Sequence, residues 1–147
     1  MIAIGCDHAA YDFKVEILEY LKAKGYDVKD LGVFAAERAN YPDYAHLVCE
    51  TIQSGECDKG ILICGTGIGM SIAANKHKGI RAALCSESLS AELSRKHNDA
   101  NVLCLGARVL GPELAKHIID AWLVTEFEGG RHQDRVDLIS RIESEEN

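Results

Sequence analysis

Residues 61–76 of the chain read ILICGTGIGMSIAANK. The apolar run that ends at Cys64 predicts a short strand buried on both faces. Glycines follow at positions 65, 67 and 69, and a segment of helical character begins after them. A buried strand that leads through a glycine-rich turn into a helix forms a natural anion site, because backbone N–H groups point outward there. The stretch therefore predicts an α/β fold with an anion site beside a thiol.

Strand-like and helix-like segments alternate along the whole chain. The predicted strands lie at 2–6, 26–31, 60–64, 80–85 and 102–106, and the predicted helices lie at 10–24, 42–55, 68–77, 87–97, 112–126 and 133–145. Such alternation predicts a parallel sheet with right-handed crossovers and helices on both faces. We expect a single domain over residues 1–147, a Rossmann-like three-layer α/β/α sandwich whose five strands follow the order 2-1-3-4-5, with a C-terminal helix.

Composition limits the class of partner. The 147 residues carry a net charge of −7, which argues against nucleic acid or an anionic membrane as the main partner. A small anionic substrate remains compatible, since a local arginine cluster can override the global sign. No apolar run approaches the ~20 residues of a membrane span. The six cysteines form no C-x-x-C pair, so we expect free thiols in the cytoplasm and no zinc site.

Several polar residues directly follow predicted strands. Asp7 and His8 come after the first strand, Cys64 ends the third, and Arg108 follows the fifth. In open parallel sheets, ligands bind outside the carboxyl ends of the strands, so these four are candidates for one site. A thiol at a helix N-terminus has a lowered pKa and can act as a base or nucleophile. The alternative for Cys64 is a small core residue, which is how we interpret the other five cysteines.

The glycine-rich turn has two interpretations. Its G-x-G-x-G spacing over Gly65, Gly67 and Gly69 is neither the dinucleotide fingerprint nor a P-loop. It predicts either a simple tight turn or a cradle of N–H groups for an oxyanion. Thr66 lies between the glycines and could present its hydroxyl to the same ligand or cap the helix.

Two arginines are candidates for phosphate binding. Arg131 and Arg135 are four residues apart at the start of the last predicted helix, so their side chains can point the same way. Arginine forks suit a phosphate, and His8 could provide a third cationic donor. The alternative is a solvated helix face.

His97 and Asn98 close the fourth predicted helix, where a simple C-terminal cap is one interpretation. That turn lies at the amino edge of the sheet, opposite Cys64. If His97 is catalytic, we therefore expect it to serve the site of a neighbouring subunit, in a symmetric dimer.

With these residues in place, the chain resembles the type B ribose-5-phosphate isomerases, within the family that also holds the galactose-6-phosphate isomerase subunits. The matching pieces span nearly the whole chain in order, and they are Gly5–His8, Tyr41-Pro42, Gly60–Lys76, Gly79–Ala82, Ser94-Arg95, His97–Asp99, Gly106–Val109, Glu128–His132 and Arg135. No single piece is specific, but the combination is.

The resemblance implies an aldose–ketose isomerase that needs no metal or other cofactor. It implies that Cys64 moves a proton between C1 and C2, and that Thr66 and His97 open the sugar ring. It assigns the enediolate to the loop from Gly65 to Gly69, the sugar to Asp7, Tyr41 and Asn98, and the phosphate to His8, Arg108, Arg131 and Arg135. It further implies that His97, Asn98 and Arg108 come from the partner subunit.

We therefore expect a homodimer with shared active sites, able to assemble into a tetramer, that interconverts ribose 5-phosphate and ribulose 5-phosphate through an enediolate. The nearest alternative is the same chemistry on a hexose 6-phosphate such as allose or galactose 6-phosphate. A non-catalytic sugar-phosphate sensor would keep Arg131 and Arg135 but would not need Cys64. A nucleotide-binding module is disfavoured by the loop spacing.

Overall fold

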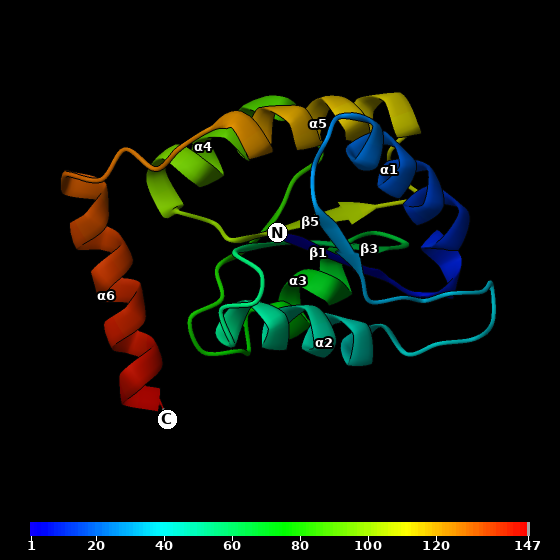
Figure 1. Ribbon diagram of the computed structural model, residues 1–147. Helices are drawn as coiled ribbons and strands as arrows, with labels where there is room; N and C mark the ends of the chain where they lie inside the picture. The colour runs from blue at the N-terminus through cyan, green and yellow to red at the C-terminus, as the bar shows by residue number, and fades with distance from the viewer. Residues whose placement is uncertain (147) are drawn as a thin grey trace.

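The computed structural model describes residues 1–146; Asn147, the last residue of the predicted domain, lies outside the described residues. Parallel strands form one sheet, and helices cover both of its faces (Figure 1). The strands are β1 (Ile2–Cys6), β2 (Val28–Asp30), β3 (Lys59–Cys64), β4 (Ala82–Leu84) and β5 (Val102–Gly106). The predicted α/β fold with a five-stranded parallel sheet is confirmed.

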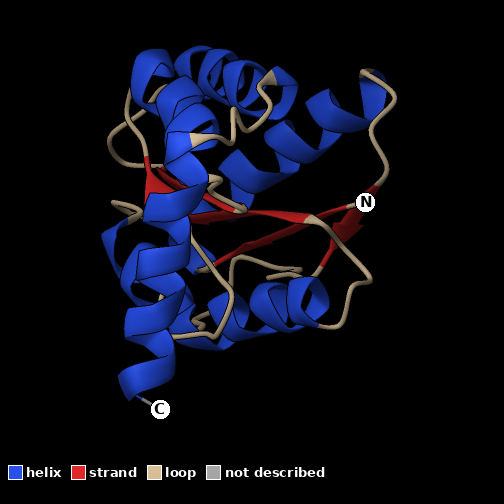
Figure 2. Ribbon diagram, turned by 90° about the vertical axis from the view of Figure 1, so that its left-hand side faces the viewer, coloured by secondary structure: helices blue, strands red, loops and turns tan. Residues whose placement is uncertain are grey.

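The helices form an outer layer on each face of the sheet (Figure 2). One face carries α1 (Tyr11–Ala23), which follows the 3-10 turn η1 (His8–Ala10), together with α4 (Ser88–Asn98) and α5 (Pro112–Val124). The other face carries α2 (Tyr41–Gln53) and α3 (Ile68–Ala74). Among the described residues, no helix has the length and apolarity that crossing a membrane requires.

The strand order differs from the prediction. The sheet runs β2-β1-β3-β5-β4, so the predicted order 2-1-3-4-5 is wrong in its last two places. The residues of β5 read VLCLG and are buried at every position, whereas β4 has three residues and is partly exposed. The more apolar strand therefore takes the interior place, and the shorter strand forms the edge.

Helix α6 (Arg131–Glu146) stands beside the rest of the fold (Figure 1). Of its described residues, only His132 and Val136 are buried. Ile139 and Ile142 continue the apolar stripe of Val136 but are 48% and 60% exposed. The helix is tied to the body near its end, where the N–H of Gly79 donates to the Glu143 carboxylate at 3.1 Å. An amphipathic helix with an uncovered apolar stripe is typical of an interface.

Candidate active site

A cleft of about 470 Å³ opens at the carboxyl ends of β1, β3 and β5. It brings together residues from four separate parts of the chain, and its lining consists of Asp7, Tyr41, Cys64, Gly65, Thr66, Ile68, Gly69, Ile72 and Arg108. Of the four residues predicted to meet at this edge, Asp7, Cys64 and Arg108 line the cleft, whereas His8 does not. We call this space the thiol cleft.

Cys64 is the last residue of β3, and its side chain is almost fully buried. The backbone N–H of Gly67 donates a hydrogen bond to its Sγ at 3.2 Å. Gly67 has φ +80°, and a Cβ there would lie 2.6 Å from the Leu84 side chain and 2.9 Å from the carbonyl carbon of Leu105. Only glycine lets the loop fold back onto the sulfur, so an N–H dipole points directly at it.

Most of the other cysteines are held as thiols. Burial raises the pKa of Cys6 and Cys85 to about 11 and the pKa of Cys49 to about 12. Burial also raises the pKa of Cys104 well above its ordinary value. These four side chains pack in the core, and none of them lines the thiol cleft. Their setting agrees with a structural role.

Asp7 and Thr66 both leave hydrogen-bonding capacity for a ligand. Asp7 is buried, and its Oδ1 has no hydrogen-bond partner among residues 1–146. A buried carboxylate oxygen without a donor is costly, so a donor from a ligand such as a sugar hydroxyl would satisfy it. The Thr66 Oγ1 accepts a hydrogen bond from the N–H of Ile68 at 3.2 Å, which leaves the hydroxyl proton to be donated.

Tyr41 lines the thiol cleft, whereas the predicted phosphate ligand His8 is not among its lining residues. The ring of Tyr41 packs directly on Gly69, where a Cβ would lie only 2.5 Å from it. His8 follows Asp7 and is exposed; its Nδ1 accepts a hydrogen bond from the N–H of Ala39 at 3.1 Å. This contact leaves Nε2 of His8 for a ligand.

Arg108 lines the thiol cleft of its own chain, whereas the resemblance implies that the partner subunit supplies this arginine. The N–H of Arg108 donates to the carbonyl of Gly65 at 2.9 Å, and the N–H of Ala107 donates to the carbonyl of Cys64 at 2.9 Å. These bonds continue the pairing of β3 with β5 beyond the strand ends. The continued pairing fixes Arg108 beside the glycine-rich loop.

A second cleft, of about 300 Å³, lies between the end of α4 and the start of α6; its lining consists of His97, Asn98, Arg131, His132, Arg135, Val136 and Ile139. We call it the histidine cleft. It brings together His97, one of the two predicted ring-opening residues, and the predicted phosphate ligands Arg131 and Arg135. None of these three residues lines the thiol cleft.

The two clefts lie at opposite edges of the sheet. Cys64 pairs with Gly106 at the carboxyl edge, and Gly60 pairs with Val102 at the amino edge. The strand between these two pairs spans about 13 Å. Asn98 ends α4 shortly before Val102, which places the histidine cleft at the amino edge. One chain therefore does not bring all of the predicted site residues together.

The end of α4 is held rigidly. Asp99 ends the helix in a left-handed conformation with φ +48°. Its carboxylate accepts hydrogen bonds from Arg95 at 2.9 Å and from Arg81 at 3.3 Å. This network fixes the turn that presents His97 and Asn98.

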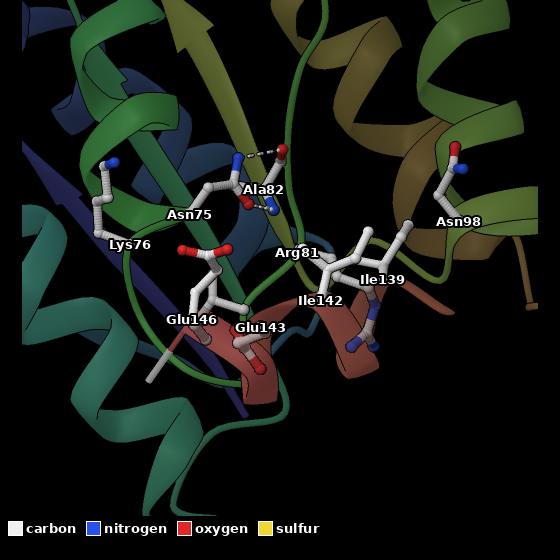
Figure 3. Close-up of a pocket in the computed structure, with 10 residues that line it drawn as sticks. Asn75, Lys76, Arg81, Ala82, Asn98, Ile139, Ile142, Glu143 and Glu146 are labelled. Carbon is white, nitrogen blue, oxygen red and sulfur yellow. Dashed lines mark hydrogen bonds between the residues drawn. The ribbon is translucent and has the colours of Figure 1, made fainter. Parts of the chain in front are cut away.

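A third cavity, of about 540 Å³, lies on the inner side of α6 (Figure 3). Ile139 and Ile142 line it from α6, and Asn75, Lys76 and Arg81 line it from the body. Asn98 and Ile139 line both this cavity and the histidine cleft, so the two adjoin, and we call them together the groove along α6. The groove is partly apolar and open.

Two residues of the second site were not assigned a role from the sequence, Glu128 and His132. They stand beside His97, and these three are the only described residues that form a possible metal-binding group, with ligand atoms within 4.8 Å of one another. The rings of His97 and His132 stack at an interplanar angle of 15°, so their nitrogen lone pairs run nearly parallel instead of converging. Metal ligands must converge on one point, and the arrangement does not fit a metal well. The sequence feature that could have pointed to these two residues is their spacing of four positions, beside Arg131.

Comparisons with known proteins agree on one family. A family model described as Ribose/Galactose Isomerase matches residues 2–139. The chain is 56% identical to ribose-5-phosphate isomerase B of Escherichia coli, over 99% of this chain and 98% of that protein. It is 51% identical to D-erythrulose-4-phosphate isomerase of Pectobacterium atrosepticum, over 99% and 96%. The solved structure of Clostridium thermocellum ribose-5-phosphate isomerase B superposes with a TM-score of 0.98 at 54% identity, covering 99% of each chain.

Proposed function

The chain belongs to the ribose/galactose isomerase family, and we propose that it interconverts D-ribose 5-phosphate and D-ribulose 5-phosphate through an enediolate, without metal or other cofactor. The observation that carries this proposal is the match over the full length to proteins named for this activity, together with a thiol cleft that keeps the elements of a proton-transfer site.

Cys64 is the proposed base. Isomerisation removes a proton from C2 of the open-chain aldose and returns one to C1. A single thiolate that lies close to both carbons can carry out both transfers. Negative charge develops on the O1 oxygen between these steps. The N–H of Gly67 lies beside the sulfur, and the N–H groups of the loop from Gly65 to Gly69 are the proposed donors that stabilise that charge.

Thr66 and His97 are the proposed ring-opening residues. Opening the furanose breaks the bond between C1 and the ring oxygen while the O1 hydroxyl becomes the carbonyl. The ring oxygen takes a proton from His97, and the Thr66 hydroxyl accepts the O1 proton as it passes its own to water. Thr66 borders Cys64, whereas His97 lies in the other cleft.

The phosphate is the proposed ligand of the basic residues. Arg108 lines the thiol cleft and His8 follows Asp7 of that cleft in the chain, while Arg131 and Arg135 line the histidine cleft. Guanidinium groups bind phosphate oxygens in pairs, which gives a local cationic site in a protein of net charge −7. Asp7, Tyr41 and Asn98 are the proposed ligands of the sugar hydroxyls.

The separation of the clefts supports a homodimer with shared sites as the proposed assembly. A two-fold axis that places the histidine cleft of one subunit on the thiol cleft of its partner completes two equal sites. The surfaces are compatible: Ile68 and Ile72 of α3 are more than half exposed beside Cys64, and the groove along α6 presents Ile139 and Ile142 (Figure 3). Pairing these residues would bury the apolar stripe that one chain leaves open.

The six cysteines are unpaired, which supports the cytoplasm as the proposed location.

The substrate is tested by comparing turnover of ribose 5-phosphate, erythrulose 4-phosphate, allose 6-phosphate and galactose 6-phosphate. We expect the highest kcat/KM with ribose 5-phosphate. Preference for a hexose phosphate would move the assignment to another member of the family, and binding without turnover of any of the four would identify a sensor.

A further inference from the structure

Two side chains without a role in the proposed reaction flank His97. His132 stacks on the His97 ring, with centroids 4.3 Å apart and planes 15° from parallel. The Glu128 Oε1 atom lies 3.5 Å from Nε2 of His132 and 4.0 Å from Nε2 of His97. One carboxylate therefore faces the same nitrogen of both rings.

The backbone holds this arrangement in place. The N–H of Glu128 donates to the carbonyl of Lys96 at 3.1 Å, which ties the segment after α5 to the last turn of α4. Gly129 and Gly130 then adopt φ +66° and +57°. This turn reverses the chain, and the N–H of His132 donates to the carbonyl of Gly129 at 3.0 Å. A left-handed pair of this kind suits glycine, and it is what brings His132 under His97.

His132 is suited to pack on its neighbour as a neutral ring. It is buried, and burial lowers its pKa, as do the facing groups His97, Arg131 and Arg135, while Glu128 acts in the opposite direction. The ring of His132 therefore stays neutral near pH 7 and does not oppose a charge on His97. Two stacked imidazolium ions would repel each other, whereas a neutral His132 ring packs on His97 without adding a like charge.

We propose that Glu128 and His132 are positioning residues for ring opening: the stack fixes the plane of the His97 ring, and the carboxylate engages its Nε2 so that Nδ1 faces the ring oxygen of the sugar. This proposal rests on the proposed function, because it needs a cyclic substrate. It separates the two chemical steps: Glu128 and His132 serve the opening of the furanose and not the proton transfer at Cys64.

An open-chain substrate separates these steps experimentally. The phosphate of ribulose 5-phosphate blocks O5, so this ketose cannot close a furanose ring. Exchange of its C1 hydrogen with deuterium from D₂O requires proton transfer alone. We expect His132→Ala and Glu128→Gln to lower the kcat for ribose 5-phosphate about tenfold, as for a misplaced general acid. The same variants should exchange deuterium into ribulose 5-phosphate at a rate within about twofold of the unmodified protein.

Matched variants control for folding and for charge. His132→Phe keeps a flat ring on His97 and should recover part of the ribose 5-phosphate turnover that His132→Ala loses. Glu126→Gln removes a nearby exposed carboxylate that has no ion pair within residues 1–146 and should leave both rates unchanged. Glu128 is half exposed, so its substitution decides the question if the alanine variant does not fold.

The outcomes are distinct. Loss of ribose 5-phosphate turnover with retained exchange supports the proposal. Equal loss of both rates, or unchanged turnover in His132→Ala and Glu128→Gln, overturns it. An unmodified protein that shows neither turnover nor exchange would instead overturn the proposed function.

Discussion

The backbone N–H of Gly67 donates a hydrogen bond to the sulfur of Cys64 at 3.2 Å. This bond joins the end of a buried strand to the turn that precedes α3, and it depends on the left-handed φ of +80° at Gly67. The thiol and the N–H dipoles are thus parts of one rigid unit. Electrostatic stabilisation of an oxyanion needs groups that are already oriented before charge develops, and this unit meets that condition.

Replacing Cys64 tests the proposed base. Cys64→Ala should lower kcat for ribose 5-phosphate by about 10²–10⁴-fold, because no other thiol lines the cleft. Calorimetry with a non-isomerisable sugar phosphate should show affinity close to that of the unmodified protein, since the proposed phosphate ligands are retained. Unchanged turnover in this variant would rule out Cys64 as the base.

Replacing Gly67 tests the loop. In Gly67→Ala the new Cβ would meet Leu84 and the backbone of Leu105 at 2.6 and 2.9 Å, in addition to the strain of positive φ. We expect a loss in the free energy of unfolding of about 1–3 kcal/mol, measured in urea, and a clear loss of kcat. Gly25→Ala is the matched control, since φ there is +89° but nothing lies within 4 Å. It should cost about 1–2 kcal/mol and leave kcat unchanged, and an equal loss of kcat in both variants would contradict this account.

Alkylation tests the difference between Cys64 and the core thiols. Cys6, Cys49 and Cys85 have pKa values of about 11 to 12, so they remain protonated up to at least pH 9. We expect iodoacetamide to modify Cys64 first in the native protein, with activity lost in step with that modification. Peptide mass spectrometry measures the sites. Protection of Cys64 by saturating sugar phosphate is the control, and activity that survives full modification of Cys64 would oppose its role.

Chelation tests the absence of a metal requirement. Exhaustive treatment with EDTA, followed by assay in metal-free buffer, should leave kcat unchanged, because each proposed step uses side chains and backbone groups alone. Activity that disappears and returns on addition of one divalent ion would assign a metal to the site. His97, Glu128 and His132 would then be the first residues to substitute.

One local rule placed part of the thiol cleft. Asp7 and Arg108 follow strands and Cys64 ends one, and parallel strands bring their carboxyl ends to one edge. His8, which the same rule named, does not line the cleft. The same rule placed Arg108 at the edge of its own chain's sheet that carries Cys64, where the structure has it. The order of β4 and β5 was not predictable in this way, since it depends on which strand the tertiary structure buries on both faces.

The surroundings of His97 depend on geometry that sequence spacing does not contain. His132 is 35 positions away from it along the chain. Their stacking requires the reversal at Gly129 and Gly130 and the bond between Glu128 and Lys96. Adjacent glycines predict a turn, but the direction of the helix that follows is set by contacts with α4. The contribution of Glu128 therefore became visible only in the structure.

In the proposed dimer, each active site combines the thiol cleft of one subunit with the histidine cleft of its partner. Mixing of two inactive variants, Cys64→Ala and His97→Ala, under conditions where subunits exchange measures this directly. In a mixed dimer both substitutions fall in one site and the other site is intact. Equal amounts should therefore recover about one quarter of the unmodified activity. No recovery, with mixed dimers demonstrated by native mass spectrometry, would contradict the shared site.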